Sequence, residues 1–296
     1  MRPASNLAIG CLLGISTLFG CSSGSVVTNG GAGSGAGGGG NSAGAPAVCT
    51  APGYHVDADA LPLEQVSAQL VDPNGEPLAD VYVQVCGVNA CITGFSDRGG
   101  KTAVAVDQPL VLPAFKYGDG YDYAELAAPL GATADQDIGR IVVVPLPGYA
   151  EGAAFPTSGT VTNGDLTLLL QPGMTVDIEN LNYPDAEEQV FRSAPVPLSA
   201  SKLAFPVSFG FELGYGVAPL LTKFCPAAGL SVKNTLAWPP GTEVEVFVQG
   251  LETDEAWAAY GTWTKVADAS VSSDGSSIDT TSGGIPILTS IALRRK

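Results

Sequence analysis

Histidine is almost missing from this sequence, and its scarcity restricts the chemistry that the chain can perform. His55 is the only histidine among 296 residues. Ser–His–Asp and Cys–His sites use a histidine as general base, and zinc peptidase sites usually take at least two histidines as ligands. His55 also follows a Gly-rich segment and stands close to a candidate domain edge. We therefore expect no enzyme activity, no catalytic residue, no metal site and no cofactor.

Basic side chains are also scarce. The chain has 13 Lys and Arg against 29 Asp and Glu, which gives a net charge of −16. Nucleic acids and anionic lipid surfaces are bound mainly through clusters of basic residues. The composition therefore argues against a nucleic-acid partner and against adhesion of the body to anionic lipid.

The longest apolar run near the N-terminus is short. It covers residues 7–19 and follows Arg2. A membrane-spanning helix needs about 20 apolar residues, so this run has the length of a secretory signal instead. It ends in Leu18-Phe19-Gly20-Cys21, which resembles the lipobox of bacterial lipoproteins, although a smaller residue is usual at position 19. Ordinary signal cleavage nearby and an uncleaved anchor are the alternatives.

The lipobox resemblance implies a location and a membrane partner. It implies that residues 1–20 are a signal peptide and that Cys21 carries lipid, palmitate included, which anchors the chain to the cell envelope. Ser22 stands where an aspartate would favour the inner membrane, so the analogy favours the outer membrane. Residues 21–48 are then the lipidated cysteine and a linker rich in Gly, Ser and Ala, without charged or aromatic residues. Such a composition predicts a flexible tether.

Four cysteines remain after the leader and the lipidated residue are set aside, and an exported protein folds where disulfides form. Cys86 and Cys91 flank a short turn that would place them opposite each other on two paired strands, so we predict that they are bridged. Cys49 and Cys225 then pair by elimination, or either stays free. A zinc site is disfavoured because the spacing is wrong.

Alternating apolar residues dominate the body, and long helical periodicity is nearly absent. Short alternating segments separated by turn residues are typical of an all-β sandwich. The turns are Asp72-Pro73-Asn74-Gly75 and Asp97-Arg98-Gly99-Gly100. In the first half, the predicted strands cover residues 66–71, 81–86, 91–95, 101–106, 110–115 and 140–145.

The segment VSAQLVDPNGEPLADVYVQVCGVNACITGFSDRGGKTAVAV resembles the carboxypeptidase-regulatory-like, transthyretin-like β-sandwich. The shared features are a strand, the turn Asp72-Pro73-Asn74-Gly75-Glu76-Pro77-Leu78, a Val-rich strand, and Ser96-Asp97 with glycines after it. The resemblance covers roughly residues 64–146 and implies an accessory module. We therefore expect a first domain at residues 49–147.

A second β-sandwich domain is expected at residues 148–296, after the break at Pro145-Leu146-Pro147-Gly148. Its sequence resembles the β-sandwich module of ankyrins and netrin receptors. The match rests on Pro219, Phe224 and Pro226, the strand at 229–232, Pro240-Gly241-Thr242 before the strand at 244–248, and the strand that holds Trp263. That resemblance implies protein–protein contact. Strands are also expected at residues 166–170 and 174–178, and a short helix or acidic loop at 183–191.

Three tyrosines are the best candidates for contact with a partner. Tyr117, Tyr121 and Tyr123 surround Gly118-Asp119-Gly120, and Gly and Asp favour a surface loop. Exposed aromatic rings beside polar groups often bind sugars or proteins. The alternative interpretation is that these rings fill the core, which is our expectation for Trp263. Calcium near Asp119 and Asp122, or near Glu252, is a weaker possibility because no EF-hand spacing is present.

These observations predict a lipid-anchored cell-envelope protein that binds or supports a protein or carbohydrate partner and catalyses nothing. The alternative is an acid-pair glycoside hydrolase, or an accessory domain of a cell-wall or polysaccharide enzyme, since glycoside hydrolysis needs only two acids. The acidic clusters are Asp185-Glu187-Glu188 and Glu252-Asp254-Glu255. Both are expected to be solvated surface.

Overall fold

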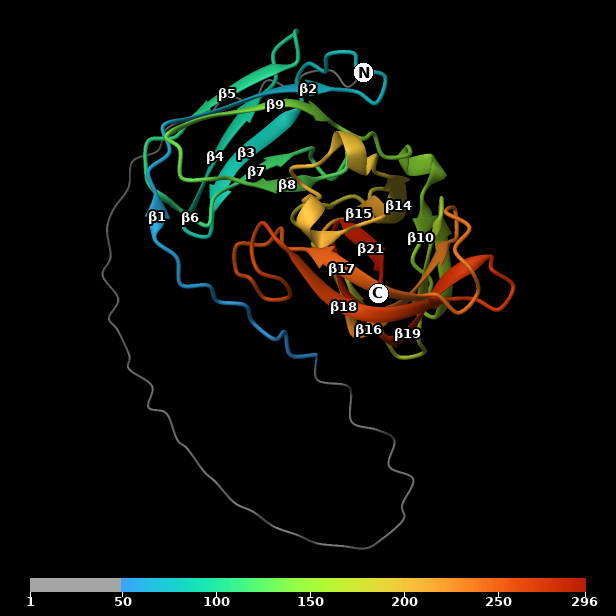
Figure 1. The fold of residues 1–296 in the computed structure, drawn as a ribbon. Coiled ribbons are helices and arrows are strands. Elements are labelled where there is room, and N and C mark those ends of the chain that lie inside the picture. The colour runs from blue at the N-terminus through green and yellow to red at the C-terminus, as the bar shows by residue number, and fades with distance from the viewer. Residues whose placement is uncertain (1–48) are drawn as a thin grey trace, which may run out of the picture. The chain divides into compact units, whose positions relative to one another are not determined.

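The structure, a computed structural model, describes residues 49–296, and β-strands are their main regular secondary structure (Figure 1). Apart from strands, these residues form three short 3-10 helices and no α-helix, which confirms the all-β prediction. The 3-10 helices are η1 (Tyr149–Glu151), η2 (Leu198–Ala200) and η3 (Val207–Phe209). The predicted signal peptide at 1–20, lipidated Cys21 and the linker at 21–48 lie outside the described residues.

The first half of the body is a sandwich of two sheets, which Figure 1 shows as separate layers. One sheet has the order β5-β2-β9, and the other has the order β4-β3-β7-β8. Alternating apolar side chains of both sheets meet between the layers, as the every-second-residue burial of β5 shows. The strands are β2 (Gln65–Val71), β3 (Tyr82–Gly87), β4 (Ala90–Phe95), β5 (Lys101–Ala105), β7 (Ala114–Tyr117), β8 (Leu126–Pro129) and β9 (Asp135–Val142), with the separate pair β1 (Ala60–Leu61) and β6 (Leu110–Val111).

The turns of this half follow the sequence closely. Gly75 and Gly100 have φ of +94° and +73°, values that glycine adopts without strain. Strands β3 and β4 form a hairpin in which Cys86 lies opposite Cys91, and their Cα atoms are 4.0 Å apart. The predicted disulfide between these two cysteines is confirmed.

Two strands of this half differ from the prediction. The expected strand at 110–115 is broken into β6 and β7, because Leu112 has a positive φ of +50° and Pro113 has no N–H to donate. The expected strand at 140–145 is replaced by β9, which begins earlier, at Asp135, and ends at Val142. Strand β9 pairs with β2 in parallel, an arrangement that local alternation does not reveal.

The second half is dominated by one large sheet whose strands surround an apolar core. The residues predicted to form a helix or acidic loop at 183–191 form a loop followed by the start of β14. The sheet order is β10 (Ala153–Ala154), β14 (Val190–Pro195), β15 (Leu213–Ala218), β21 (Ile291–Arg295), β17 (Glu243–Gln249), β18 (Trp263–Val271), β19 (Ser277–Gly283), β16 (Thr222–Lys233), β12 (Leu166–Leu170) and β11 (Gly159–Asn163), while β13 (Thr175–Asp177) and β20 (Ile285–Leu288) also pair with β16.

The two halves share apolar contacts. Residues 46–296 form one compact unit, and the core of the first sandwich also contains Phe205, Phe247 and Trp263. The burial of Trp263 confirms that its ring belongs to a core, and its indole N–H donates to the Ala204 carbonyl at 2.7 Å. A disulfide joins Cys49 to Cys225, so the second predicted pair is also confirmed. The division into domains at residues 147 and 148 stays a prediction.

Candidate functional site

The loop between β7 and β8 is shaped by Asp119 and two glycines. The Asp119 carboxylate accepts the backbone N–H groups of Tyr121, Asp122 and Tyr123 at 2.9–3.0 Å. Gly120 has a positive φ of +70°, and a Cβ there would lie 2.4 Å from the Leu220 side chain. The Gly-Asp-Gly sequence therefore fixes a tight loop against the second half of the body.

The three tyrosines of this loop have different surroundings. Tyr117 is 1% exposed and belongs to the core of the first sandwich, so the expected surface position is wrong for this residue. Its strand alternates, and Tyr117 falls on the same face as buried Phe115. Tyr121 and Tyr123 are partly exposed. Burial, and then nearby acids, raise the pKa of both.

Tyr121 packs against Tyr183, a residue that the sequence did not single out. Their ring centroids are 5.1 Å apart. The Tyr183 hydroxyl donates to the Gly120 carbonyl at 3.1 Å and accepts the Leu220 N–H at 2.8 Å, and burial raises its pKa. The only sequence signal for Tyr183 was an aromatic residue at the start of an otherwise polar, acidic loop. Tyr183 thus links the β7–β8 loop to Leu220 through these two hydrogen bonds.

Arg192, in β14, is hydrogen-bonded to the backbone of the same loop. Its side chain is 1% exposed, and its guanidinium lies over the Tyr149 ring, 4.0 Å from the centroid. One Nη donates to the carbonyls of Tyr121 at 2.6 Å and Pro147 at 3.1 Å. A buried arginine that binds two carbonyls restrains the backbone at Tyr121.

A groove of about 490 Å³ lies next to Tyr121, within the size range of ligand pockets. We call it the tyrosine groove. Residues from the sheet β4-β3-β7-β8 and from loops of the second half meet there. Its lining comprises Tyr82, Gln84, Phe95, Lys116, Asp119, Tyr121, Glu125, Asn182, Tyr183, Leu220, Leu221 and Leu251.

An ion pair with little exposure lies in the tyrosine groove. Lys116 Nζ and Glu125 Oε1 are 2.7 Å apart, and their side chains are only 14% and 13% exposed. Lys116 projects from β7, and the Glu125 carbonyl accepts the Ser290 hydroxyl at 2.8 Å. Since the two opposite charges compensate each other, the groove can hold a ligand without leaving either charge unpaired.

Phe95 and Tyr82 give the groove an aromatic surface that the sequence analysis missed. They lie opposite each other on β4 and β3, with ring centroids 5.4 Å apart. Phe95 is 62% exposed, which is unusual for so large an apolar side chain. The signal was present in the alternation of β3, where Tyr82 and Gln84 face away from buried Val83 and Val85. Tyr121 and this aromatic pair therefore belong to one site, whereas Tyr117 and Tyr123 do not line it.

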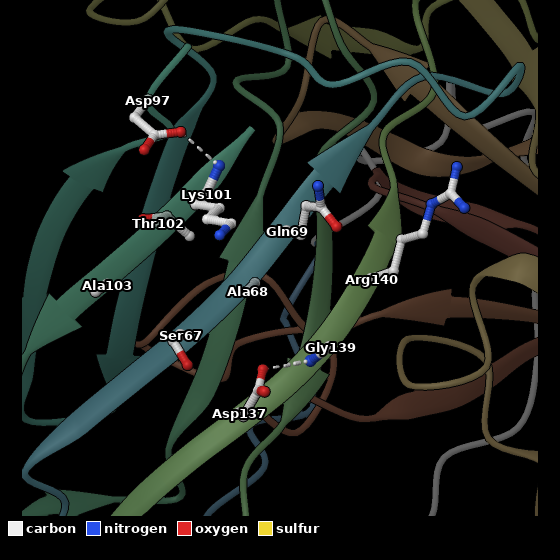
Figure 2. A pocket seen from close by; sticks show the side chains of 10 residues that line it. All are labelled: Ser67, Ala68, Gln69, Asp97, Lys101, Thr102, Ala103, Asp137, Gly139 and Arg140. Carbon is white, nitrogen blue, oxygen red and sulfur yellow. Dashed lines mark hydrogen bonds between the residues drawn. The ribbon is translucent and has the colours of Figure 1, made fainter. Parts of the chain in front are cut away.

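A second hollow lies on the outer face of the sheet β5-β2-β9 (Figure 2). Figure 2 shows polar side chains there, with Lys101 on β5, Gln69 on β2 and Asp137 on β9. Its acids are occupied by local turns, because Asp97 accepts the N–H of Lys101 and Asp137 that of Gly139, each at 2.9 Å. No aromatic residue lines this hollow, so it offers less to a ligand than the tyrosine groove.

The expectation that both acidic clusters are solvated surface is wrong for Glu188 and Glu255, which are 6% and 5% exposed. Glu252 lies 3.4 Å from Lys223, and burial raises its pKa. The Glu255 carboxylate is buried and accepts the Tyr260 N–H at 3.0 Å. Within residues 49–296, His, Cys, Asp and Glu form no group of three that could hold a metal ion.

His55, the only histidine, does not line the tyrosine groove. Its imidazole is 84% exposed and pairs with Asp57 at 3.0 Å. A histidine in open solvent gains little from a single exposed acid two residues away. The histidine therefore lines neither the groove nor the hollow of Figure 2.

The fold and the tyrosine groove are the features that bear on the function of this chain. The part of the chain that the structure describes contains no helix long and apolar enough to cross a membrane. No family model matches the sequence, and no curated protein matches it significantly.

Proposed function

We propose that this chain is a lipid-anchored protein of the bacterial cell envelope whose body binds a protein or glycan partner in the tyrosine groove. The observation that carries the proposal is the exposed Phe95 beside Tyr82, in a groove that also contains the Lys116–Glu125 ion pair. Large aromatic side chains often supply most of the binding energy of an interface. The body acts by binding and performs no chemistry.

The N-terminal sequence supports the envelope location. A short apolar run at 7–19 and the lipobox-like Leu18-Phe19-Gly20-Cys21 support lipidation of Cys21, and Ser22 favours the outer membrane by analogy. The two disulfides of the body, Cys86–Cys91 and Cys49–Cys225, fit an oxidising compartment. The resemblances to the carboxypeptidase-regulatory-like and ankyrin/netrin-receptor sandwiches support an accessory or interaction role.

The anchor is tested by fractionating cells that produce the chain with Cys21→Ser. The wild type should partition with the outer membrane and into detergent. The variant should be released into the soluble fraction, because it lacks the cysteine that carries the acyl chains of the anchor. A Cys11→Ser variant is the matched control and should behave as the wild type. Retention of the Cys21→Ser protein in the membrane would show that the anchor is wrongly assigned.

The binding role is tested by capture from the native envelope with the full-length protein in detergent. Phe95→Ala should reduce capture of the partner about tenfold, as loss of an anchoring aromatic often does. Val207→Ala is the control, because Val207 is 81% exposed but does not line the groove. Equal capture by all three proteins would place the contact elsewhere on the body.

The acid-pair hydrolase has less support than binding. Of the two acids that line the tyrosine groove, Glu125 is paired with Lys116 and Asp119 is occupied by three backbone N–H groups. Neither carboxyl is arranged to protonate a glycosidic oxygen. Release of reducing sugar by the wild type, lost in Glu125→Gln, would favour the hydrolase over the binding protein.

A further inference from the structure

We infer that the ligand of the tyrosine groove is a neutral oligosaccharide. The inference rests on the proposed function, because it names the class of partner that the groove binds. It is carried by three features of the groove, namely its exposed aromatic faces, its uncommitted amide and hydroxyl groups, and its balanced charges. Each of them matches a chemical property of uncharged sugars.

The aromatic surface suits the apolar face of a sugar ring. The Phe95 ring is 62% exposed, and Tyr82 stands next to it with its centroid 5.4 Å away, tilted by 57°. The faces of aromatic rings carry partial negative charge, and the axial C–H groups of a pyranose carry partial positive charge, so the two stack. Two tilted rings on a rigid hairpin form a platform for successive sugar units. The cross-strand disulfide Cys86–Cys91 closes the same hairpin.

The groove also offers polar groups that have not been used within the protein. Gln84 donates one amide N–H to the Tyr82 oxygen at 2.9 Å. Among the described residues, the Gln84 carbonyl oxygen, the Tyr82 hydroxyl proton and the side-chain amide of Asn182 have no partner. An amide pairs a donor with an acceptor at a fixed spacing, which matches two neighbouring hydroxyls of a sugar. An apolar peptide segment would leave these groups unsatisfied.

The charges of the groove favour an uncharged ligand. Lys116 is neutralised by Glu125 at 2.7 Å, and Asp119 already accepts three backbone N–H groups. No further basic side chain lines the groove, and the whole chain carries −16. A polyanionic glycan would therefore be repelled. A neutral glycan meets no such penalty, and its binding should depend little on salt.

Leu221, in the groove, has an unfavourable backbone conformation of the kind found at binding sites. It lines the groove with φ at +61°, in a region that a leucine rarely adopts. Such strained positions persist where the surrounding structure holds them, and they cluster at ligand sites. The uncommitted amides and the charge balance of the groove favour a glycan over a peptide.

The test is a titration of the full-length lipoprotein in detergent with defined oligosaccharides. The probes are maltohexaose, cellohexaose, xylohexaose and fully N-acetylated chitohexaose as neutral glycans, and polygalacturonate and heparin as anionic ones. At least one neutral probe should bind, with an affinity that is unchanged when the salt concentration is raised. Phe95→Ala and Gln84→Ala should each weaken that binding about tenfold, whereas Val207→Ala should not change it.

The outcomes separate this inference from the proposed function. Binding of the anionic probes alone would overturn the inference. The inference would also be overturned if no glycan bound while the native envelope yielded a protein whose capture is lost in Phe95→Ala. That result would leave the proposed binding role intact. Failure of both experiments would overturn the inference and the proposed function together. Gln84→Ala keeps the test valid if Phe95→Ala lowers the stability of the hairpin.

Discussion

Tyr117 and Phe95 belong to the same four-stranded sheet, yet one is 1% exposed and the other 62%. The register of the sheet explains the difference. Tyr117 lies opposite Val83 and Phe95 lies opposite Tyr82, and consecutive residues of a strand face opposite sides. Tyr117 therefore points into the sandwich core, and Phe95 points into the tyrosine groove.

Replacing Tyr117 and Phe95 by alanine should have opposite consequences. Tyr117→Ala should lower the free energy of unfolding by about 3–5 kcal/mol, because it leaves a cavity in a packed core. Phe95→Ala should change it by less than about 1 kcal/mol, since much of the ring is already in solvent. Thermal unfolding followed by circular dichroism measures both. A small effect of Tyr117→Ala would show that its ring is accessible after all, as the sequence suggested.

Gly120 should tolerate no side chain. Gly120→Ala forces a positive φ on alanine and places its Cβ against Leu220, so the free energy of unfolding should fall by about 1–3 kcal/mol. Gly131→Ala is the matched control, because no atom lies within 4 Å of a Cβ built there. Denaturant titrations of the two variants compare them. Equal midpoints would contradict the tight loop described for residues 118–120.

At the scale of residues, the sequence predicts types of contact better than their positions. The cysteine pairs could be predicted because a five-residue spacing across a turn restricts the geometry, and the second pair followed by elimination. The burial of Trp263 followed from strand alternation. The outward face of Phe95 could have been read from the alternation of the β3–β4 hairpin, whereas Tyr183 was missed because its contacts with Gly120 and Leu220 join segments far apart in the chain.

At the scale of elements, the C-terminal strand β21 and the residue that follows it are held by ion pairs at their polar end. Arg294 pairs with Glu245, Arg295 with Glu212, and Lys296 with Asp268, at distances of 2.7–2.8 Å. Lys265 and Asp268 both lie on β18 and are also 2.8 Å apart. Hydrogen bonds from the lysines, Lys265 first and then Lys296, lower the pKa of Asp268 to about 2.

This cluster predicts a specific pH dependence. A carboxyl with a lowered pKa in the folded state stabilises that state fully above its unfolded pKa of about 4, and the contribution is lost as pH falls toward about 2. Removing both lysines, with Lys265→Ala and Lys296→Ala, should raise the pKa of Asp268 toward its ordinary value. NMR titration of the side-chain carboxyl carbons measures the shift.

Asp274 provides the internal control for that titration. Its pKa is also lowered to about 2, but by hydrogen bonds from Ser272 and Ser276. It should keep its value in the double lysine variant. If Asp268 and Asp274 moved together, or neither moved, the assignment of the Asp268 shift to the two lysines would be wrong.

Elements with local causes were predicted well, and elements with distant partners were not. Hairpin β3–β4 and the turns at Gly75 and Gly100 follow from short segments whose residues favour one geometry. The parallel pairing of β9 with β2 joins residues about 70 positions apart, and the break between β6 and β7 depends on the positive φ of Leu112. Neither leaves a periodic signal in the sequence.

At the scale of the whole molecule, the contacts between the two halves favour cooperative unfolding. Gln249 is completely buried and binds both the N–H and the carbonyl of Ala127, and Phe205 and Trp263 extend the core of the first sandwich. The sequence, in contrast, predicts separate domains at 49–147 and 148–296, with proteolytic cleavage between about residues 146 and 158. Leu146 is nearly buried, and the Pro147 carbonyl is bound by Arg192.

We expect the two halves to unfold in one transition. Trp238 lies in the core of the second half, but Trp263 packs in the core of the first sandwich, so tryptophan fluorescence does not separate the two halves. Hydrogen exchange of amides in β12 and β16 reports on the second half. Hydrogen exchange of amides in β2 and β3 reports on the first half. The two probes should give the same midpoint in denaturant, and the segment 146–158 should resist protease below that midpoint. Separate midpoints, with cleavage in that segment, would establish two independent domains.

The central claim is that the tyrosine groove is the surface through which this chain binds its partner. The most direct measurement places a photoreactive phenylalanine analogue at position 95 or, as the control, at position 207, in cells that make the whole chain. Illumination should give a covalent adduct from position 95 and none from position 207, since both side chains are exposed but only the first lines the groove. Adducts of equal yield at both positions, or an adduct from position 207 alone, would contradict the claim.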